Sequence, residues 1–181
     1  MTDSLYFDTD CLSAFLWVKE EKILSQLYPG NIVVPQPVYN ELSIPAITHL
    51  KNRIDTLIGN DSATVQPIFV DSPEYSIYSK LTTAPDEGHS IIGKGEAAVI
   101  ALAFAYGGIV ASNNIRDVGT YVTKLKLRHI TTGDIMMRAL EQSIITEADG
   151  NSIWSDMLAK RRKLGALSFT SYLHMNRMRV K

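Results

Sequence analysis

Short apolar segments alternate with longer amphipathic segments along most of the chain. Apolar runs of a few residues that stop at a polar residue or a proline are typical of buried β-strands. Five segments are candidate strands on this pattern: residues 4–7, 31–34, 65–70, 109–111 and 129–131. Pro67 limits the third of them to the edge of a sheet, because proline has no N–H to donate to a neighbouring strand.

Apolar residues at helical spacing predict helices between these strands and after them. The predicted helices are residues 11–19, 20–28, 37–42, 48–58, 93–106, 116–125, 133–143 and 145–158. The segment 93–106 gives the strongest signal, since it is rich in alanine and a pair of glycines closes it. Thr9 and Asp10 are candidates for the N-cap of the first helix. Residues 81–90 have the composition of a loop.

Strands that alternate with helices predict an α/β fold, with a central parallel sheet of four to five strands and helices on both faces. Binding sites in such sheets lie beyond the carboxyl ends of the strands. The chemistry of this protein is therefore expected from the residues that follow each strand.

Composition narrows the class of protein further. Hydrophobic residues make up 45% of the 181 residues and charged residues 20%, as in ordinary globular domains. Cys11 is the single cysteine, so an intrachain disulfide and a cysteine-rich zinc site are excluded. The longest apolar runs, such as residues 97–105, are far shorter than the roughly 20 residues of a membrane helix. Because the first ten residues also lack a secretion-signal pattern, we expect a soluble, cytoplasmic protein without membrane contact.

The charge is distributed unevenly along the chain. The net charge is −1, yet residues 160–181 hold seven lysines and arginines and no acidic residue. The first 159 residues carry 11 basic and 19 acidic side chains. A basic tail on an acidic body indicates contact with a polyanion or an acidic partner. A solvated C-terminal helix explains the same charges equally well.

Acidic and amide side chains stand where the fold predicts a site. They are Asp8 and Asp10 after the first strand, Glu41 beyond the second, Glu96 at the start of the helix 93–106, and Asn114 and Asp117 after the strand 109–111. Taken singly, most of them have a structural explanation as helix caps or as favourable charges at helix N-termini. Asp8 is different, because a carboxylate at the end of an aromatic strand is partly buried and needs a partner.

Several carboxylates at one edge repel one another, and a divalent cation removes that repulsion. Mg²⁺ and Mn²⁺ prefer carboxylate and water oxygens, and such a site hydrolyses phosphodiesters by activating a bound water. The sequence suggests no serine, cysteine or histidine nucleophile. A Mg²⁺-dependent phosphatase or phosphotransferase stays open as an alternative. Asp8 and Asp10 permit its paired-acid pattern, but the lysine and Ser/Thr motifs that it needs after later strands are not convincing.

Four segments together resemble the PIN-domain nucleases. They are YFDTD (residues 6–10), VPQPVYNEL (34–42), GKGEAAVIALA (93–103) and IVASNNIRDV (109–118), with HITTGDI (129–135) following. Their order and spacing fit over roughly residues 4–140. The resemblance is greatest to the toxin ribonucleases of prokaryotic toxin–antitoxin systems. It implies a parallel three-layer sandwich, Mg²⁺ or Mn²⁺ as cofactor, RNA as substrate and an antitoxin protein as partner.

The resemblance also implies roles for individual residues. Asp8, Glu41 and Glu96 match the family's metal-binding acids. The fourth acidic position departs from the family, because Asn114 stands there and Asp117 follows one helical turn later. We expect Asp117 to act as the fourth catalytic acid, and we count Asn114, Asp117 and Asp10, which replaces the family's usual asparagine, among the candidate metal ligands. A catalytically weak or inactive RNA- or protein-binding module is the alternative.

The expected organisation is a nuclease domain over residues 1–140 and a helical, basic extension over residues 141–181 that packs on it. We also expect a homodimer. Residues 160–163 are consecutive and basic, so a helix would spread them around its circumference. We therefore expect them to support RNA affinity or partner docking rather than catalysis.

Overall fold

A five-stranded parallel sheet forms the centre of the computed structural model, which describes residues 3–85 and 90–179. The strand order is β3-β2-β1-β4-β5, and every neighbouring pair runs parallel. The strands are β1 (Leu5–Phe7), β2 (Ile32–Pro35), β3 (Ala63–Gln66), β4 (Ile109–Ala111) and β5 (Arg128–Ile130). This confirms the predicted α/β architecture, and it places β3 at an edge as expected. The predicted bounds 65–70 of this strand are wrong for residues 67–70, because β3 ends at Gln66, directly before Pro67.

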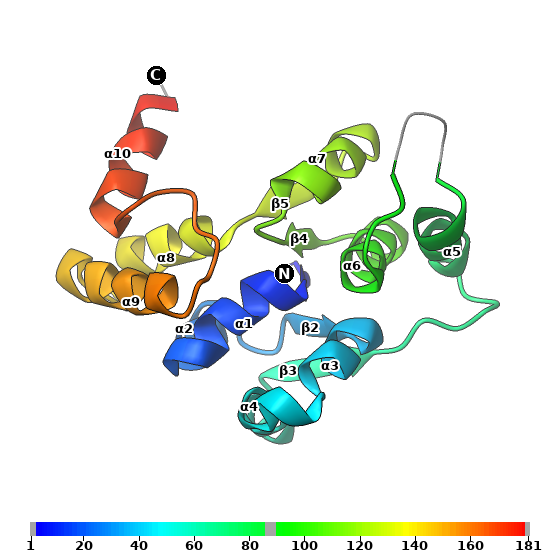
Figure 1. Ribbon diagram of the computed structural model, residues 1–181, viewed down its shortest axis with the longest axis horizontal. Coiled ribbons are helices and arrows are strands. Elements are labelled where there is room, and N and C mark those ends of the chain that lie inside the picture. Colours follow the sequence, from blue (N-terminus) through cyan, green and yellow to red (C-terminus); the bar gives the residue numbers. More distant parts are fainter. Residues whose placement is uncertain (1–2, 86–89, 180–181) are drawn as a thin grey trace.

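Helices cover both sides of the sheet (Figure 1). They are α1 (Thr9–Val18), α2 (Glu21–Leu27), α3 (Gln36–Leu42), α4 (Thr48–Gly59), α5 (Tyr75–Thr83), α6 (Lys94–Tyr106), α7 (Ile115–Lys124), α8 (Thr132–Glu141), α9 (Glu147–Ala159) and α10 (Phe169–Arg179), with a short 3₁₀ helix, Pro45–Ile47, before α4. Helix α6 packs on β1, β2 and β4, with α5 and α7 beside it, while α1 packs against α4 and α9. No helix in the described part of the chain is long and apolar enough to span a membrane.

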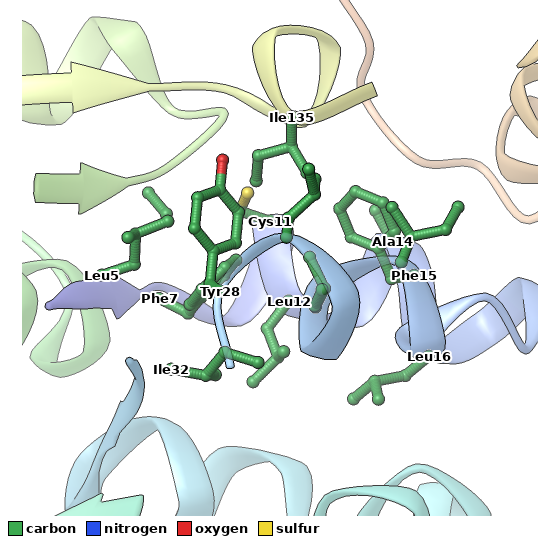
Figure 2. Close-up of a cluster of buried hydrophobic side chains, with 14 of the residues drawn as sticks. Leu5, Phe7, Cys11, Leu12, Ala14, Phe15, Leu16, Tyr28, Ile32 and Ile135 are labelled. Atoms are coloured by element: carbon green, nitrogen blue, oxygen red, sulfur yellow. The ribbon is translucent and has the colours of Figure 1, made fainter. Parts of the chain in front are cut away.

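The core forms around β1 and α1, which follow each other with one residue between them. Leu5 and Phe7 of the strand and Leu12, Phe15 and Leu16 of the helix are almost completely buried. Figure 2 shows these side chains packed with residues of neighbouring elements, such as the Ile135 side chain of α8. A strand buried on both faces must be apolar throughout, which is why its sequence shows a continuous run rather than alternation. This packing fixes the end of β1, where the first predicted site residue lies.

Helix α5 is an element that the sequence analysis did not predict. Its last residues, Leu81 to Thr83, fall inside the segment 81–90 that was expected to be a loop, so this expectation is wrong for them. Leu81 is buried against Ile92 and Ile100, and this tertiary contact stabilises a helix whose own sequence signal is weak. Residues 86–89 of the same segment lie outside the described residues.

The segment after α8 folds back onto the rest of the protein. Helix α9 packs on α1, and α10 packs on α8 and α9. Trp154 of α9 is fully buried and donates its indole N–H to the Ala166 carbonyl oxygen at 3.0 Å. Helix α9 ends at Ala159, and residues 160–163 form a turn and an irregular loop instead of the helical turn that was expected. Arg161 takes a positive φ of 58°, which ends the helix at this point.

A glycine sets the distance between α9 and α10. A Cβ atom on Gly150 would lie 2.3 Å from Phe169 Cδ1, and Phe169 is fully buried, so its ring has no room to move. We expect Gly150→Ala to lower the free energy of unfolding by about 1–3 kcal/mol, the usual cost of overpacking. Gly59→Ala is the matched control, because nothing lies within 4 Å of its Cβ position; its greater helix propensity should stabilise the protein by about 0.5–1 kcal/mol. Urea unfolding measures both variants, and equal or higher stability of Gly150→Ala would contradict this packing.

Candidate metal site

The predicted site residues gather at the edge where β1, β2 and β4 end. Asp8 follows β1 directly, and Glu41 lies in α3, which begins directly after β2. Glu96 lies in the first turn of α6, and Asn114 is the N-cap of α7, with Asp117 in its first turn. Because the strands are parallel, their carboxyl ends and the helix N-termini that follow meet on one side of the molecule.

Asp8 is the N-cap of α1. Its backbone N–H donates to the Ala111 carbonyl oxygen at 2.9 Å, which extends the pairing of β1 with β4 by one residue. Its Oδ1 atom accepts a hydrogen bond from the Cys11 N–H at 2.6 Å. The expectation that Thr9 or Asp10 caps this helix is therefore wrong. The strand runs into the helix without a loop, so the first polar residue takes the cap position.

The Asp8 carboxyl is 2% exposed, and this burial raises its pKa from 3.8 to about 7. Hydrogen bonds from Ser112 and from the Cys11 N–H oppose the rise, while the charges of Asp10 and Glu96 add to it. Loss of hydration and nearby like charges both disfavour the carboxylate form. A buried acid in this situation is stabilised by a cation, or it takes up a proton.

Glu41 meets α1 and α6 at the same edge. The Thr9 hydroxyl donates a hydrogen bond to Glu41 Oε2. A Cβ atom at position 95 would lie 3.2 Å from both carboxylate oxygens of Glu41, so Gly95 allows the first turn of α6 to approach this side chain closely. The Glu41 carboxylate therefore lies against the N-terminus of α6, where the helix macrodipole favours a negative charge.

Asn114 lies between two of the predicted acids. Its Nδ2 atom donates to Glu96 Oε1 at 3.2 Å and to Asp117 Oδ2 at 2.8 Å. Its Oδ1 atom accepts from the Asp117 N–H at 3.3 Å and so caps α7. The amide holds Glu96 and Asp117 together and supplies donors to both, which a carboxylate at position 114 would not do.

A cation from the C-terminal part of the chain reaches the same edge. Arg162 Nη1 lies 3.6 Å from Asp10 Oδ1 and donates to Ser13 Oγ at 3.2 Å. No local sequence pattern pairs Arg162 with Asp10, because 152 positions separate them. The basic run 160–163 indicated only that a cation was present in this segment. It did not indicate which of its four side chains contacts the rest of the protein.

The turn that carries Asn114 is tied to the turn after β5. Asn113 Nδ2 donates to Thr132 Oγ1 at 2.8 Å, and the Thr132 N–H donates back to Asn113 Oδ1 at 2.9 Å. A ring nitrogen of His129, Nε2, lies 2.8 Å from the Ser112 carbonyl oxygen. These three residues were not among the predicted site residues, and their role is to hold the Asn114 segment in position.

The oxygen atoms at this edge are of the kind that a hard divalent cation prefers as ligands. Carboxylate oxygens dominate the edge, and such oxygens are the ligands that Mg²⁺ and Mn²⁺ prefer. Burial raises the pKa of Asp8, and the charges of Asp10 and Glu96 add to this rise. Within the ranges 3–85 and 90–179, however, no three His, Cys, Asp or Glu side chains lie close enough together to hold a metal ion. Glu41 pairs with Thr9, and Glu96 and Asp117 pair with Asn114. An ion would therefore have to draw carboxylates out of these hydrogen bonds.

A family model described as a PIN domain matches residues 5–166 of the chain. The chain belongs to the PIN-domain family. PIN domains are generally nucleases that use divalent metal ions, which agrees with the acidic edge described above. The match runs beyond residue 140, where the motif resemblance ends; it includes α9 and stops before α10. A comparison with curated protein sequences gives no match.

The buried Asp8 makes the stability of this PIN domain depend on pH when no metal is present. Because its folded pKa is about 7 and its ordinary pKa is 3.8, the folded state holds this proton more tightly than the unfolded state. The stability that Asp8 contributes is therefore greatest below pH 4 and is lost as the pH rises to about 7. We expect Asp8→Asn to stabilise the protein in EDTA by on the order of 3 kcal/mol at pH 8 and by far less at pH 4.

Urea unfolding at both pH values measures this effect. Asp149→Asn is the control with the opposite sign, because its hydrogen bond from Thr146 lowers the Asp149 pKa. The Asp149→Asn variant should lose stability at pH 8. An Asp8→Asn variant that is no more stable than wild type at pH 8 would contradict the burial argument.

Proposed function

We propose that this PIN domain is a metal-dependent endoribonuclease that hydrolyses phosphodiester bonds of RNA with Mg²⁺ or Mn²⁺. The observation that carries the proposal is the buried Asp8 carboxyl at the end of β1, with Glu96 and Asp10 close enough to raise its pKa. A PIN-domain fold with such a group at the carboxyl edge of its sheet is suited to bind cations and, through them, phosphates.

In this proposal, Asp8, Glu41 and Glu96 hold the metal, and Asp117 completes the acidic set. A bound Mg²⁺ or Mn²⁺ supplies a water of lowered pKa and neutralises the phosphate. Asn114 is a positioning residue, because its amide keeps the Glu96 and Asp117 carboxylates beside each other. Its amide oxygen accepts the Asp117 N–H and so caps α7. This oxygen could bind a metal ion only after that hydrogen bond breaks.

Asp10 and Arg162 have a different part in the proposal. Asp10 lies in the first turn of α1 with a partly exposed carboxylate, and Arg162 lies beside it with only 22% of its side chain exposed. The guanidinium lowers the net negative charge at the rim of the site. A phosphodiester approaching the acids therefore meets a cation there as well as carboxylates.

The toxin role, the antitoxin partner and a homodimer belong to the same proposal. Their support is the resemblance of the four motif segments to toxin nucleases. Glu41 and Asp117 are exposed, so a basic side chain of an inhibitory protein has access to them. A cytoplasmic location fits an enzyme that acts on cellular RNA. A non-catalytic RNA-binding module remains the second candidate, because Asn114 stands where the family often has an acid.

Cleavage of a labelled single-stranded RNA tests the enzyme directly. We expect wild-type protein to cut it in Mn²⁺ or Mg²⁺ and to lose this activity in EDTA. Glu96→Gln should reduce the rate by at least roughly 100-fold, because losses of 10–100-fold already follow changes in groups that only support metal ligands. Glu141→Gln is the matched control, since its exposed side chain lies at the end of α8, away from the acidic edge.

The outcomes separate the two candidate functions. Metal-dependent cleavage that survives Glu141→Gln and fails with Glu96→Gln supports the nuclease. RNA binding without cleavage in any metal would favour the binding module. Equal activity of wild type and Glu96→Gln would remove Glu96 from the site.

A further inference from the structure

A cavity of about 440 Å³ lies next to the acidic edge, between the end of β5 and α10. Its walls come from the turn after β4 (Asn113), from β5 and its end (His129 and Thr131), from the loop before α10 (Lys163) and from α10 itself (Tyr172 and Asn176). We call this cavity the α10 cleft. A volume of this size is within the range of small-ligand sites and admits one nucleotide.

The floor of the α10 cleft is rigid. The Tyr172 hydroxyl donates to Asp134 Oδ1 at 2.7 Å and lies 3.0 Å from Thr131 Oγ1. A Cβ atom on Gly133 would lie 2.3 Å from Tyr172 Cζ, so the ring is packed directly on the first turn of α8. The cleft is therefore formed by the folded chain before any ligand binds, which avoids the entropic cost of ordering it.

The described residues that line the α10 cleft include one carboxylate and one ammonium group, and only the ammonium group is free to bind a ligand. Asp134 lines the cleft, but its carboxylate accepts hydrogen bonds from the Thr131 N–H, the Thr131 hydroxyl and Tyr172. Lys163 is exposed, and within the described part of the chain it makes no ion pair or hydrogen bond. Its ammonium group is therefore available to a phosphate at the mouth of the cleft.

The rim of the α10 cleft is apolar. Ile115 is 61% exposed and Met175 is 41% exposed, although both are large hydrophobic residues. A cation beside exposed apolar side chains suits a nucleotide, which combines a charged phosphate with the flat, apolar face of its base. Polar groups of the base edge would meet the hydroxyls and amides of the walls.

The α10 cleft is continuous with the acidic edge. Asn113 and Ile115, which line the cleft, flank Asn114, and Asn114 is bonded to Glu96 and Asp117. The loop before α10 contributes a cation to both the acidic edge and the cleft. Arg162 lies beside Asp10, and the next residue, Lys163, lines the cleft. A ligand chain that occupies the cleft therefore continues directly to the acids.

We propose that the α10 cleft holds the nucleotide adjacent to the one whose phosphodiester is cut. Lys163 contacts its phosphate, and Ile115 and Met175 contact its base. This inference rests on the proposed function, since it takes RNA as the substrate. Helix α10, which supplies Met175 to the cleft, lies outside the residues that the family model matches, whereas Ile115 and Lys163 lie within them.

Binding of a short fluorescein-labelled single-stranded RNA in EDTA tests the proposal without cleavage. We expect Lys163→Gln to weaken binding at least fivefold and to reduce the slope of log K against log salt by about 0.7–1, the loss of one phosphate contact. Lys160→Gln is the matched control, because this lysine of the same loop lies over the Trp17 ring instead, 5.9 Å from its centroid. It should change the affinity less than twofold.

A second pair of variants tests the base contact. Met175→Asp should weaken binding at least fivefold, and on a mixed-sequence RNA it should change the preferred cleavage positions. Leu167→Asp introduces the same charge at a side chain that is 91% exposed and does not line the cleft, and it should leave both properties unchanged. Circular dichroism establishes that all four variants fold.

The outcomes distinguish this inference from the proposed function. Selective weakening by Lys163→Gln and Met175→Asp supports the cleft, even if wild type cleaves nothing and the nuclease proposal fails. Equal weakening by cleft and control variants would show non-specific attraction and overturn the proposal. If both cleft variants bind RNA as tightly as wild type does, the proposal is also overturned. The cleft would then bind another ligand, such as a protein partner. An absence of RNA binding by wild type would overturn it as well.

Discussion

The buried carboxyl of Asp8 is the feature on which the site depends. It occupies the one position between a buried strand and a helix that begins at once, so the fold cannot move it into water without separating β1 from α1. Its hydration is lost, and two acids, Asp10 in the first turn of α1 and Glu96 of α6, add negative charge around it. Most of the polar architecture at this edge reduces that cost, through hydrogen bonds from Ser112 and Cys11 and through the nearby helix N-termini.

At position 8, the residue that would give the most stable fold differs from the residue that metal binding requires. A neutral residue at position 8 would remove the electrostatic cost, and the retained carboxylate is useful only where a cation can share it. The hydrogen bonds of Glu41, Glu96 and Asp117 to Thr9 and Asn114 fix these acids at the same edge of the sheet as Asp8 without any ion. Metal binding would exchange those neutral donors for a divalent charge. The affinity of the site for metal is therefore the free energy of the new ion–carboxylate contacts minus that of the hydrogen bonds that are lost.

The sequence predicted the parts of the fold that rest on local pattern. The strands 4–7, 31–34 and 109–111 were predicted close to their observed bounds, because apolar runs that end at polar residues identify buried parallel strands. The positions of Asp8, Glu41 and Glu96 after strands or at helix starts followed from the same reasoning. Helix α5 was missed, since its stability comes from the contact of Leu81 with Ile92 and Ile100 and not from its own residues.

Features that depend on tertiary contacts could not be read from the chain. The contact between Arg162 and Asp10 joins the two ends of the sequence, and no local pattern predicts it. The basic run 160–163 was expected to be helical, but α9 ends before it, so its side chains diverge to Trp17, to Asp10 and to the α10 cleft. The N-cap of α1 was assigned to Thr9 or Asp10, because sequence alone does not show that β1 and α1 are joined without a loop.

The ionisation of Asp8 measures the central claim most directly. In a protein with ¹³C-labelled aspartate, the carboxyl resonance of Asp8, assigned with Asp8→Asn, is followed by NMR as the pH is raised. Without metal, the account predicts a midpoint near pH 7. With saturating Mg²⁺, it predicts a midpoint below about 4, because a bound cation favours the carboxylate. A midpoint near 4 in the absence of metal, or one near 7 that Mg²⁺ does not move, would contradict it.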